Sequence, residues 1–371
     1  MTADAVQRLR LIRTPTIGPV TYRQLIARFG DAGRALDALP DLARRGGRRL
    51  EIAGALLAED ELAALARLGA VPLFLGTSQY PALLAATETA PPMLAAQGDL
   101  TMLERPALAV VGARNASAAG VRLARLWCEG LSAAGLVIVS GLARGIDAAA
   151  HGGALEGATM DAGGTVAVVA GGVDVVYPPE NAALMARIGE AGLVLAEAPV
   201  GTQPQARHFP RRNRIIAGLA AATLVVEAAP RSGSLITARL AADYGRDVLA
   251  VPGSPLDPRA QGCNQLIREG ATLVQRVDEV LEALSAFGDD GAEALGQRFQ
   301  LAEGPVSMVS ELAPEAARAR ILSLLSPAPV AVDELVQQSG LAAPDVASVL
   351  LDLELEGMMQ RHAGGRVGLA A

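Results

Sequence analysis

Residues 105–147 read RPALAVVGARNASAAGVRLARLWCEGLSAAGLVIVSGLARGID. They contain two short apolar runs, Leu108–Val111 and Leu136–Val139, each followed by a glycine-containing loop and then a helical pattern. Four similar runs come later in the chain: Thr165–Ala170, Leu193–Ala196, Ala222–Val226 and Val248–Val251. Continuous apolar strands that alternate with helices are typical of a parallel sheet covered on both faces. We therefore predict an α/β domain over residues 105–285, with a Rossmann-like, doubly wound and mostly parallel sheet.

The segments on either side of this domain have different patterns. Residues 1–70 have helical apolar spacing, and Ile17-Gly18-Pro19 between two helices resembles a helix-hairpin-helix or SAM-like unit. Residues 71–104 are rich in turn residues and predict a linker with one short strand, and residues 286–315 predict a second linker. Residues 316–371 predict three helices followed by a hairpin that turns at Gly364-Gly365, which together make a winged helix.

The composition limits the classes of function. The chain has 371 residues, no lysine and a net charge of −7. Its length suggests two or three domains. Without lysine there is no Walker A phosphate loop, so an anion site must use arginine side chains or backbone N–H groups. The acidic balance argues against a nucleic-acid binder on average, although local patches decide binding. Cys128 and Cys263 cannot form a disulfide framework or a four-ligand zinc site, and we expect no metal.

Targeting signals are not evident in the sequence. The first residues, MTADAVQRLRLIRTP, place charges where a signal peptide needs an apolar run. No apolar run reaches the 18 residues that a membrane-spanning helix requires. We expect a cytoplasmic protein with no membrane contact.

The loops that follow the predicted strands are the candidate binding region. In a parallel sheet, the ligand site lies beyond the carboxyl ends of the strands, where loops meet helix amino termini. The first loop holds Gly112 and Arg114, and Ser117 can cap the next helix, whose free N–H groups favour an anion. The second loop holds Arg144, and the third holds Gly172, which allows close approach of the backbone to a ligand.

Catalytic motifs are not found in these loops. There is no GxSxG, no HExxH, no pair of carboxylates and no GxGxxG. Asp147 and His151 lie four residues apart on one predicted helix face, and we interpret them as a helix cap and a packed histidine. The sequence therefore predicts no catalytic residue, no cofactor and no enzymatic activity.

The most informative loop is Arg207–Arg214, which reads RHFPRRNR, with four arginines in eight residues, and runs into a helix predicted at Ile215–Leu219. Arginines at a helix amino terminus are unfavourable unless an anion binds there. The residues that we expect to bind are Phe209, which offers a stacking surface, with Arg211, Arg212 and Asn213. The alternative is a solvated charge run paired with surface carboxylates.

A second anion-receptive segment lies further along the chain. Ser232, Gly233 and Ser234 place small hydroxyl residues around a glycine at a helix start, a pattern typical of an anion-binding nest. Several such helix starts along one edge suit a string of phosphates better than a single ligand.

Taken together, these loops resemble the DNA-processing protein A (DprA/Smf) family. The resemblance rests on seven blocks in order: Val110–Arg114, Ser140–Asp147 with His151, Gly171–Asp174 with Tyr177, Pro178 and Asn181, Phe209–Ile216, Ser232–Ala238, Val251–Gly253 and Gly262–Asn264. The chain departs from the family at Ala113, where a serine is usual, and in the stretch Gly157–Gly164, which is longer than usual.

The resemblance implies a single-stranded DNA-binding protein that loads the recombinase RecA during natural transformation and recombination. It also implies a homodimer built through the α/β domain. Arg114 falls on the family's glycine–small–arginine motif, which touches DNA, and Phe209, Arg212 and Asn213 fall on its aromatic-to-RNR motif. A competing hypothesis is a nucleotide-hydrolysing enzyme similar to the lysine-decarboxylase-like proteins, but the stretch Arg231–Thr237 lacks the glutamate of their PGGxGTxxE signature.

The charge of the winged helix argues against DNA binding by that domain. Its predicted third helix, Pro344–Glu356, holds no arginine and four acidic residues: Asp345, Asp352, Glu354 and Glu356. Such third helices often enter the major groove, where these carboxylates would repel the phosphates. We expect this domain to contact protein, such as RecA or a sister subunit, rather than duplex DNA.

Overall fold

The structure is a computed structural model that describes residues 2–45, 50–288, 314–362 and 364–370. The chain divides into two compact units. One is Glu61–Leu301, and the other combines Met1–Asp60 with Ala302–Ala371. The expected linker over residues 286–315 lies mostly outside the described residues.

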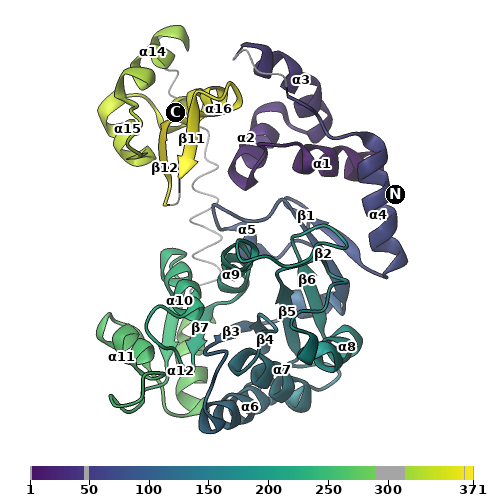
Figure 1. The fold of residues 1–371 in the computed structure, drawn as a ribbon, viewed down its shortest axis with the longest axis vertical. Coiled ribbons are helices and arrows are strands. Elements are labelled where there is room, and N and C mark those ends of the chain that lie inside the picture. Colours follow the sequence, from purple (N-terminus) through teal and green to yellow (C-terminus); the bar gives the residue numbers. More distant parts are fainter. Residues whose placement is uncertain (1, 46–49, 289–313, 363, 371) are drawn as a thin grey trace. The chain divides into compact units, whose positions relative to one another are not determined.

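A nine-stranded sheet forms the centre of the unit Glu61–Leu301, with the order β1-β2-β6-β5-β4-β3-β7-β8-β9. Figure 1 labels β1 to β7 of this sheet. The strands are β1 (Val71–Phe74), β2 (Met93–Gly98), β3 (Ala107–Val111), β4 (Val137–Ser140), β5 (Thr165–Val169), β6 (Leu193–Ala196), β7 (Ala222–Val225), β8 (Asp247–Ala250) and β9 (Thr272–Leu273). Strands β3 to β9 pair in parallel, while β1 and β2 are antiparallel. The predicted doubly wound, mostly parallel sheet is confirmed.

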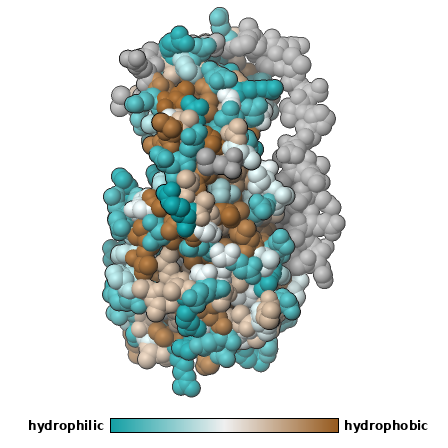
Figure 2. All heavy atoms as spheres, turned by 90° about the vertical axis from the view of Figure 1, so that its right-hand side faces the viewer, coloured by the Kyte–Doolittle hydropathy of each residue, from teal (hydrophilic) through white to brown (hydrophobic). Residues whose placement is uncertain are grey.

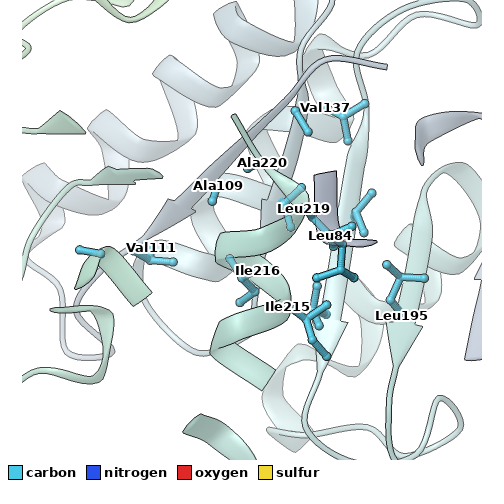
Figure 3. Packing of buried hydrophobic residues seen from close by; sticks show 14 of the residues in the cluster. Leu84, Ala109, Val111, Val137, Leu195, Ile215, Ile216, Leu219 and Ala220 are labelled. Carbon is cyan, nitrogen blue, oxygen red and sulfur yellow. The ribbon is translucent and has the colours of Figure 1, made fainter. Parts of the chain in front are cut away.

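Helices cover both faces of the sheet, which explains the continuous apolar strands. All five residues of β3 are buried, and they alternate between the two faces as the strand pleat requires. On one face, Leu108 and Val110 pack against α6 (Ala118–Ala133), α7 (Ile146–Gly157) and α12 (Val277–Gly288). On the other face, Val111 joins a cluster with α9 (His208–Leu219), α10 (Gly233–Asp243) and α11 (Gln261–Arg268). Figure 3 shows part of this second cluster, with Ile215 and Ile216 projecting from α9.

Residues 71–104, expected to be a linker with one short strand, instead form two strands that extend the sheet. Strand β2 pairs antiparallel with β6, and β1 pairs with β2 at the edge. The segment also contains α5 (Ala82–Ala85) and η1 (Leu100–Leu103). The sequence MLAAQG of β2 has no β-branched or aromatic residue, so pairing with β6 rather than local propensity makes it a strand. Two more elements, η2 (Pro179–Asn181) and α8 (Ala182–Ala191), lead from β5 to β6.

The terminal segments form the domains that the sequence predicts. The N-terminal helices are α1 (Ala3–Arg13), α2 (Pro19–Phe29), α3 (Ala32–Arg45) and α4 (Ala55–Arg67), of which α4 crosses the boundary between the units. The winged helix consists of α14 (Pro314–Leu324), β10 (Val330–Ala331), α15 (Val332–Ser339), α16 (Ala343–Leu355), β11 (Met359–His362) and β12 (Arg366–Leu369).

The described surface is mixed in polarity. Figure 2 shows one face, on which hydrophilic and hydrophobic residues are interspersed. Exposed apolar atoms are normal, because a folded chain has too little polar area to cover itself. Among the helices of the described ranges, none combines the length and the apolar character that crossing a bilayer demands.

Helices α6 and α7 approach each other so closely that the side of α7 that faces α6 carries glycine, at Gly153 and Gly157. A Cβ atom at Gly153 would lie 2.0 Å from the carbonyl oxygen of Arg125 on α6. At the neighbouring Gly152, a Cβ atom would meet nothing within 4 Å. Of these two adjacent glycines, only Gly153 is needed for the close packing of α7 against α6.

The substitution Gly153→Ala should lower the free energy of unfolding by about 1–3 kcal/mol, because the backbones of α6 and α7 must separate. The matched control Gly152→Ala should raise it by up to about 1 kcal/mol, because alanine favours the helix and has open space. Urea denaturation followed by circular dichroism measures both changes. Equal effects of the two substitutions would contradict the close packing.

Candidate functional site

The site lies at the carboxyl end of β3, where the order in which the strands follow one another across the sheet changes direction. Strand β3 has β4 on one side and β7 on the other, and the chain leaves β3 toward α6 but leaves β7 toward α10 on the opposite face. Loops that diverge in this way leave a crevice at the carboxyl ends of the strands. A cavity of about 640 Å³ opens there, lined by the loop after β3, the loop after β7 and the start of α9.

A second, smaller cavity of about 180 Å³ lies beside the first. The loops that follow β4 and β5 line it, together with Tyr177 and Glu180. Arg114, Ala143 and Phe209 line both cavities. These three residues therefore form the wall between the two cavities.

Within this wall, Arg114 and Phe209 form a cation–π pair, and Tyr177 of the smaller cavity contacts Phe209 from the side. The guanidinium carbon of Arg114 lies 4.9 Å from the centre of the Phe209 ring. The ring of Tyr177 lies 5.7 Å from that of Phe209, tilted by 55°. A guanidinium over an aromatic face is held by the ring quadrupole and keeps its N–H donors at its edge. Since Arg114 is exposed, those donors remain available to an anion.

A buried histidine holds the loop after β4. Leu142 has a left-handed backbone with φ 54°, which is costly for a leucine. Its N–H donates to Nε2 of His151 at 3.3 Å, and its carbonyl oxygen accepts from Nδ2 of Asn181 at 2.9 Å. The Thr165 hydroxyl donates to the carbonyl of Ile138, so Nδ1 of His151, 2.7 Å away, carries the proton and donates to Thr165. The interpretation of His151 as a packed histidine is confirmed.

Arg212 lies inside the protein rather than on its rim. It is 6% exposed, and its Nη1 donates to the carbonyl oxygen of Val168 at 3.1 Å. Burial lowers the pKa of Arg212, while the nearby carboxylate of Asp147 raises it. A Cβ atom at Gly141 would lie 1.5 Å from Nη1, so the glycine makes room for the guanidinium. The expected direct phosphate contact does not fit this burial, because most of the guanidinium is turned toward the protein.

Asp147 is the buried carboxylate next to Arg212. It lies in the first turn of α7 and accepts a hydrogen bond from the N–H of Ala143, in the preceding loop, at 3.3 Å. The expected helix cap is wrong, because the N-cap position is Gly145 and no side chain caps this helix. Burial raises the pKa of Asp147, and the charge of Arg212 opposes that shift. The negative charge of Asp147 and the positive charge of Arg212 therefore compensate each other in the wall of the larger cavity, which both residues line.

The helix start after β3 is already filled by an anion of the chain itself. The backbone N–H of Ser117 donates to Oε2 of Glu227 at 2.9 Å, and the Ser117 hydroxyl donates to the other carboxylate oxygen. Ser117 caps α6 by accepting from the N–H of Gly120 at 2.9 Å. The predicted cap is confirmed. The prediction that this helix start binds an external anion is wrong, because the Glu227 carboxylate occupies it. The sequence offered only one signal for Glu227: an acidic residue directly after an apolar strand.

The helix that carries the arginine cluster begins earlier than expected, at His208 instead of Ile215. Within this helix Arg211 is exposed, Arg212 is buried, and Arg214 points inward to Glu197 and the carbonyl of Thr89. The four arginines therefore do not act as one patch. For Arg214, the alternative interpretation is confirmed: its charge is paired with a carboxylate of the protein, that of Glu197.

The helix start after β7 remains open to a ligand. The hydroxyl of Ser232 accepts from the N–H of Ser234 at 3.4 Å and lies 2.8 Å from the Ser234 hydroxyl. Nδ2 of Asn213 donates to the carbonyl of Gly233 at 3.3 Å, which joins α9 to this loop. All four residues line the larger cavity, together with Arg231, which the sequence reasoning did not single out.

Most of the predicted residues converge at the two cavities. The larger cavity collects Gly112, Arg114, Phe209, Arg212, Asn213, Ser232, Gly233 and Ser234. The smaller cavity adds Arg144, whose guanidinium lies 3.6 Å from the Glu180 carboxylate. Arg211 and Gly172 line neither cavity. The N–H of Gly172 donates to the carbonyl of Thr202, so this glycine packs against its own chain.

The burial of His151 makes stability depend on pH. Burial lowers the pKa of His151 from 6.5 to about 3, so the folded state keeps the ring neutral. In the unfolded chain the ring binds a proton below pH 6.5, whereas in the folded protein it does so only below about pH 3. The free energy of unfolding is therefore unaffected by this residue above pH 6.5 and decreases as the pH falls from 6.5 toward 3. Between pH 7 and pH 5 we expect a loss of about 2 kcal/mol from this residue. Urea denaturation at pH 7, 6 and 5 should show this loss in the unsubstituted protein.

His151→Gln should remove most of the loss, because glutamine has no proton to bind in this range. His208→Gln, at a far less buried ring, is the matched control and should remove much less. An identical pH dependence in His151→Gln and the unsubstituted protein would be inconsistent with a neutral, buried ring.

Known families match each part of the chain. A family model described as DNA recombination-mediator protein A matches residues 72–285. A DprA-like N-terminal HHH domain matches residues 2–64, and a DprA winged helix domain matches residues 307–365. The chain is 40% identical over 291 residues to Protein Smf of Escherichia coli (strain K12), covering 78% of this chain and 75% of that protein. It is 48% identical over 202 residues to DNA processing protein DprA of Streptococcus pneumoniae, covering 54% and 70% respectively.

Solved structures show the same relationship. DprA from Streptococcus pneumoniae superposes with a TM-score of 0.62 at 37% identity, covering 76% of this chain and 98% of that one. DprA from Helicobacter pylori, described for its single-stranded DNA binding mode, superposes with a TM-score of 0.53 at 25% identity, covering 60% and 98%. Since the N-terminal helices, the α/β domain and the winged helix all match in this order, the chain belongs to the DNA-processing protein A (DprA/Smf) family.

Proposed function

We propose that this protein binds single-stranded DNA at the two cavities beside β3, without catalysing a reaction. The observation that carries the proposal is the exposed guanidinium of Arg114, which is held over Phe209 in the wall shared by both cavities. It combines an anion-binding donor with an aromatic surface at one point. Phosphates and bases are the two parts of a nucleic acid that such a pair recognises.

The shape of the site favours a single strand over a duplex. The binding groups lie inside cavities, where a flexible strand can bend to bring a phosphate or an unpaired base. In a duplex the bases are stacked and paired, so their faces cannot reach Phe209 or Tyr177. Arg144, at the smaller cavity, and Arg211, outside both cavities, are exposed and can hold further phosphates of the strand. Phosphate contacts position the strand but do not read its sequence.

Two further parts of the proposal rest on family membership. We propose that the bound strand is delivered to the recombinase RecA in natural transformation and recombination, and that the protein acts as a homodimer through its α/β domain in the cytoplasm. The arginines that line the two cavities, Arg114 and Arg144, support the binding of the DNA strand. The matching of all three domains to the family supports the remainder.

The alternative function, nucleotide hydrolysis, would need a catalytic carboxylate, and few carboxylates line the two cavities. Among the described residues that line the cavities, the carboxylates are Asp147 and Glu180. Asp147 is buried and accepts from the N–H of Ala143, and Glu180 pairs with Arg144. The stretch Arg231–Thr237 supplies hydroxyl groups but no glutamate. We therefore propose binding rather than catalysis.

Arg114→Ala should weaken binding of a labelled oligo(dT) about tenfold, because it removes a charge-assisted phosphate contact. The loss should be similar for oligo(dC), and the salt dependence should become shallower. Fluorescence anisotropy over a salt series measures these quantities. Arg122→Ala, at an exposed arginine of α6 outside both cavities, is the matched control and should bind normally. Binding to duplex as tight as to single strands would count against the proposal.

Arg212→Ala should act mainly on stability. It removes the buried cation beside Asp147, and we expect the free energy of unfolding to fall by about 3 kcal/mol. Arg114→Ala, at an exposed side chain, should change it by less than about 0.5 kcal/mol. Thermal denaturation of the two variants side by side separates internal support from ligand contact. An Arg212→Ala protein with unchanged stability would show that the buried charge is dispensable.

A further inference from the structure

Helix α16 of the winged helix has two buried apolar faces. Val346, Leu350 and Leu353 face the core of the winged helix. At about 100° per residue, Leu351 and Leu355 lie about 140° and 180° around the helix from Val346. They are nevertheless only 1% and 6% exposed. A helix with buried apolar residues on two opposite sides must be covered on both sides.

The N-terminal helices supply this second cover. Leu351 and Leu355 belong to the same apolar cluster as Leu11 on α1, Leu25 on α2 and Leu36 on α3. These helices and the winged helix lie within one compact unit, Met1–Asp60 with Ala302–Ala371. The outward leucines of α16 are therefore part of the core of the N-terminal domain.

Polar contacts surround the apolar centre. Nη1 of Arg28 lies 2.6 Å from Oδ1 of Asp352. The hydroxyl of Thr21 donates to Oε2 of Glu354 at 3.2 Å, and Arg361 donates to the same oxygen at 3.0 Å. Arg361 also donates to Oε1 of Gln24 on α2 at 3.2 Å. An apolar centre with a polar rim is the anatomy of a specific protein interface.

We propose that the winged helix is a protein-binding module whose partner is the N-terminal helical domain of the same chain, and that this contact closes α16 to duplex DNA. Duplex-binding winged helices use the outward face of the third helix to enter the major groove. Here that face carries Leu351, Leu355, Asp352 and Glu354, which fit the arginine, hydroxyl and apolar groups of α2 and α3. The same carboxylates would repel a DNA backbone. This contact is separate from the DNA site proposed in the α/β domain.

A cysteine placed on the outward face tests the contact in the full chain. The native thiols of Cys128 and Cys263 are buried, and burial raises the pKa of both, so they react slowly. In Leu355→Cys, we expect a neutral maleimide to label the new thiol at least tenfold more slowly than in Met160→Cys, whose parent side chain is 95% exposed. Leu351→Cys provides a second probe if Leu355→Cys folds poorly.

Charge reversal then identifies the partner. Adding Arg28→Glu or Asp352→Arg to the probe should speed labelling about tenfold, because like charges then meet at the rim. Combining both reversals should restore slow labelling, since the pair is re-formed in the opposite sense. Arg34→Glu, at an exposed arginine of α3 that pairs locally with Asp31, is the control and should leave the rate unchanged.

Several results would overturn the proposal. Fast labelling of both probes in the otherwise unchanged chain would mean that the face is uncovered. Slow labelling that neither reversal alters would mean that something other than the N-terminal domain covers it. A rate that falls with protein concentration would assign the cover to a second copy. Protection of the probe by duplex DNA in the Arg28→Glu protein would make α16 a DNA-reading helix.

Discussion

The buried guanidinium of Arg212 is the interaction around which the candidate site is arranged. It donates to the carbonyl of Val168 at the end of β5, lies against Gly141 after β4, and balances the charge of Asp147 at the start of α7. Strand β5 and the connection from β4 to α7 are thereby both held by one cation of α9. Since a buried charge is costly unless it is compensated, this geometry tolerates little displacement. The exposed Arg114 can then present its charge from a rigid edge.

An acidic protein can offer a local site for anions when its own carboxylates take some helix starts and leave others open. Glu227 fills the start of α6, which therefore needs no external anion. The start of α10 is capped by Ser232 and faces the larger cavity without such a carboxylate among the described contacts. The net charge of −7 therefore says little about this edge of the sheet.

The winged helix shows how the same fold can serve a different purpose. Its topology is that of a DNA-reading domain, but the charges and leucines of α16 suit a protein surface. The acidic composition of this helix already indicated a protein contact. Only the packing of Leu351 and Leu355 identifies which part of the chain supplies it.

Periodicity in the sequence determined the element order, the parallel sheet, the terminal domains and the edge where the binding loops meet. These properties depend on local spacing, and the spacing of apolar residues reports which face of an element is buried. The alternation of apolar runs and helices was enough to bring Arg114, Phe209, Asn213 and Ser232 to one crevice.

The tertiary structure alone decided which of these residues point inward. Because α9 begins at His208, successive turns of about 100° send Arg211 outward and Arg212 inward, although the two look equivalent in the sequence. Long-range pairing likewise made β2 a strand, placed Glu227 on Ser117 and covered Leu355 with α2 and α3. Each of these outcomes depends on a partner distant in the chain, and local patterns carry no information about which distant partner will fill a given position.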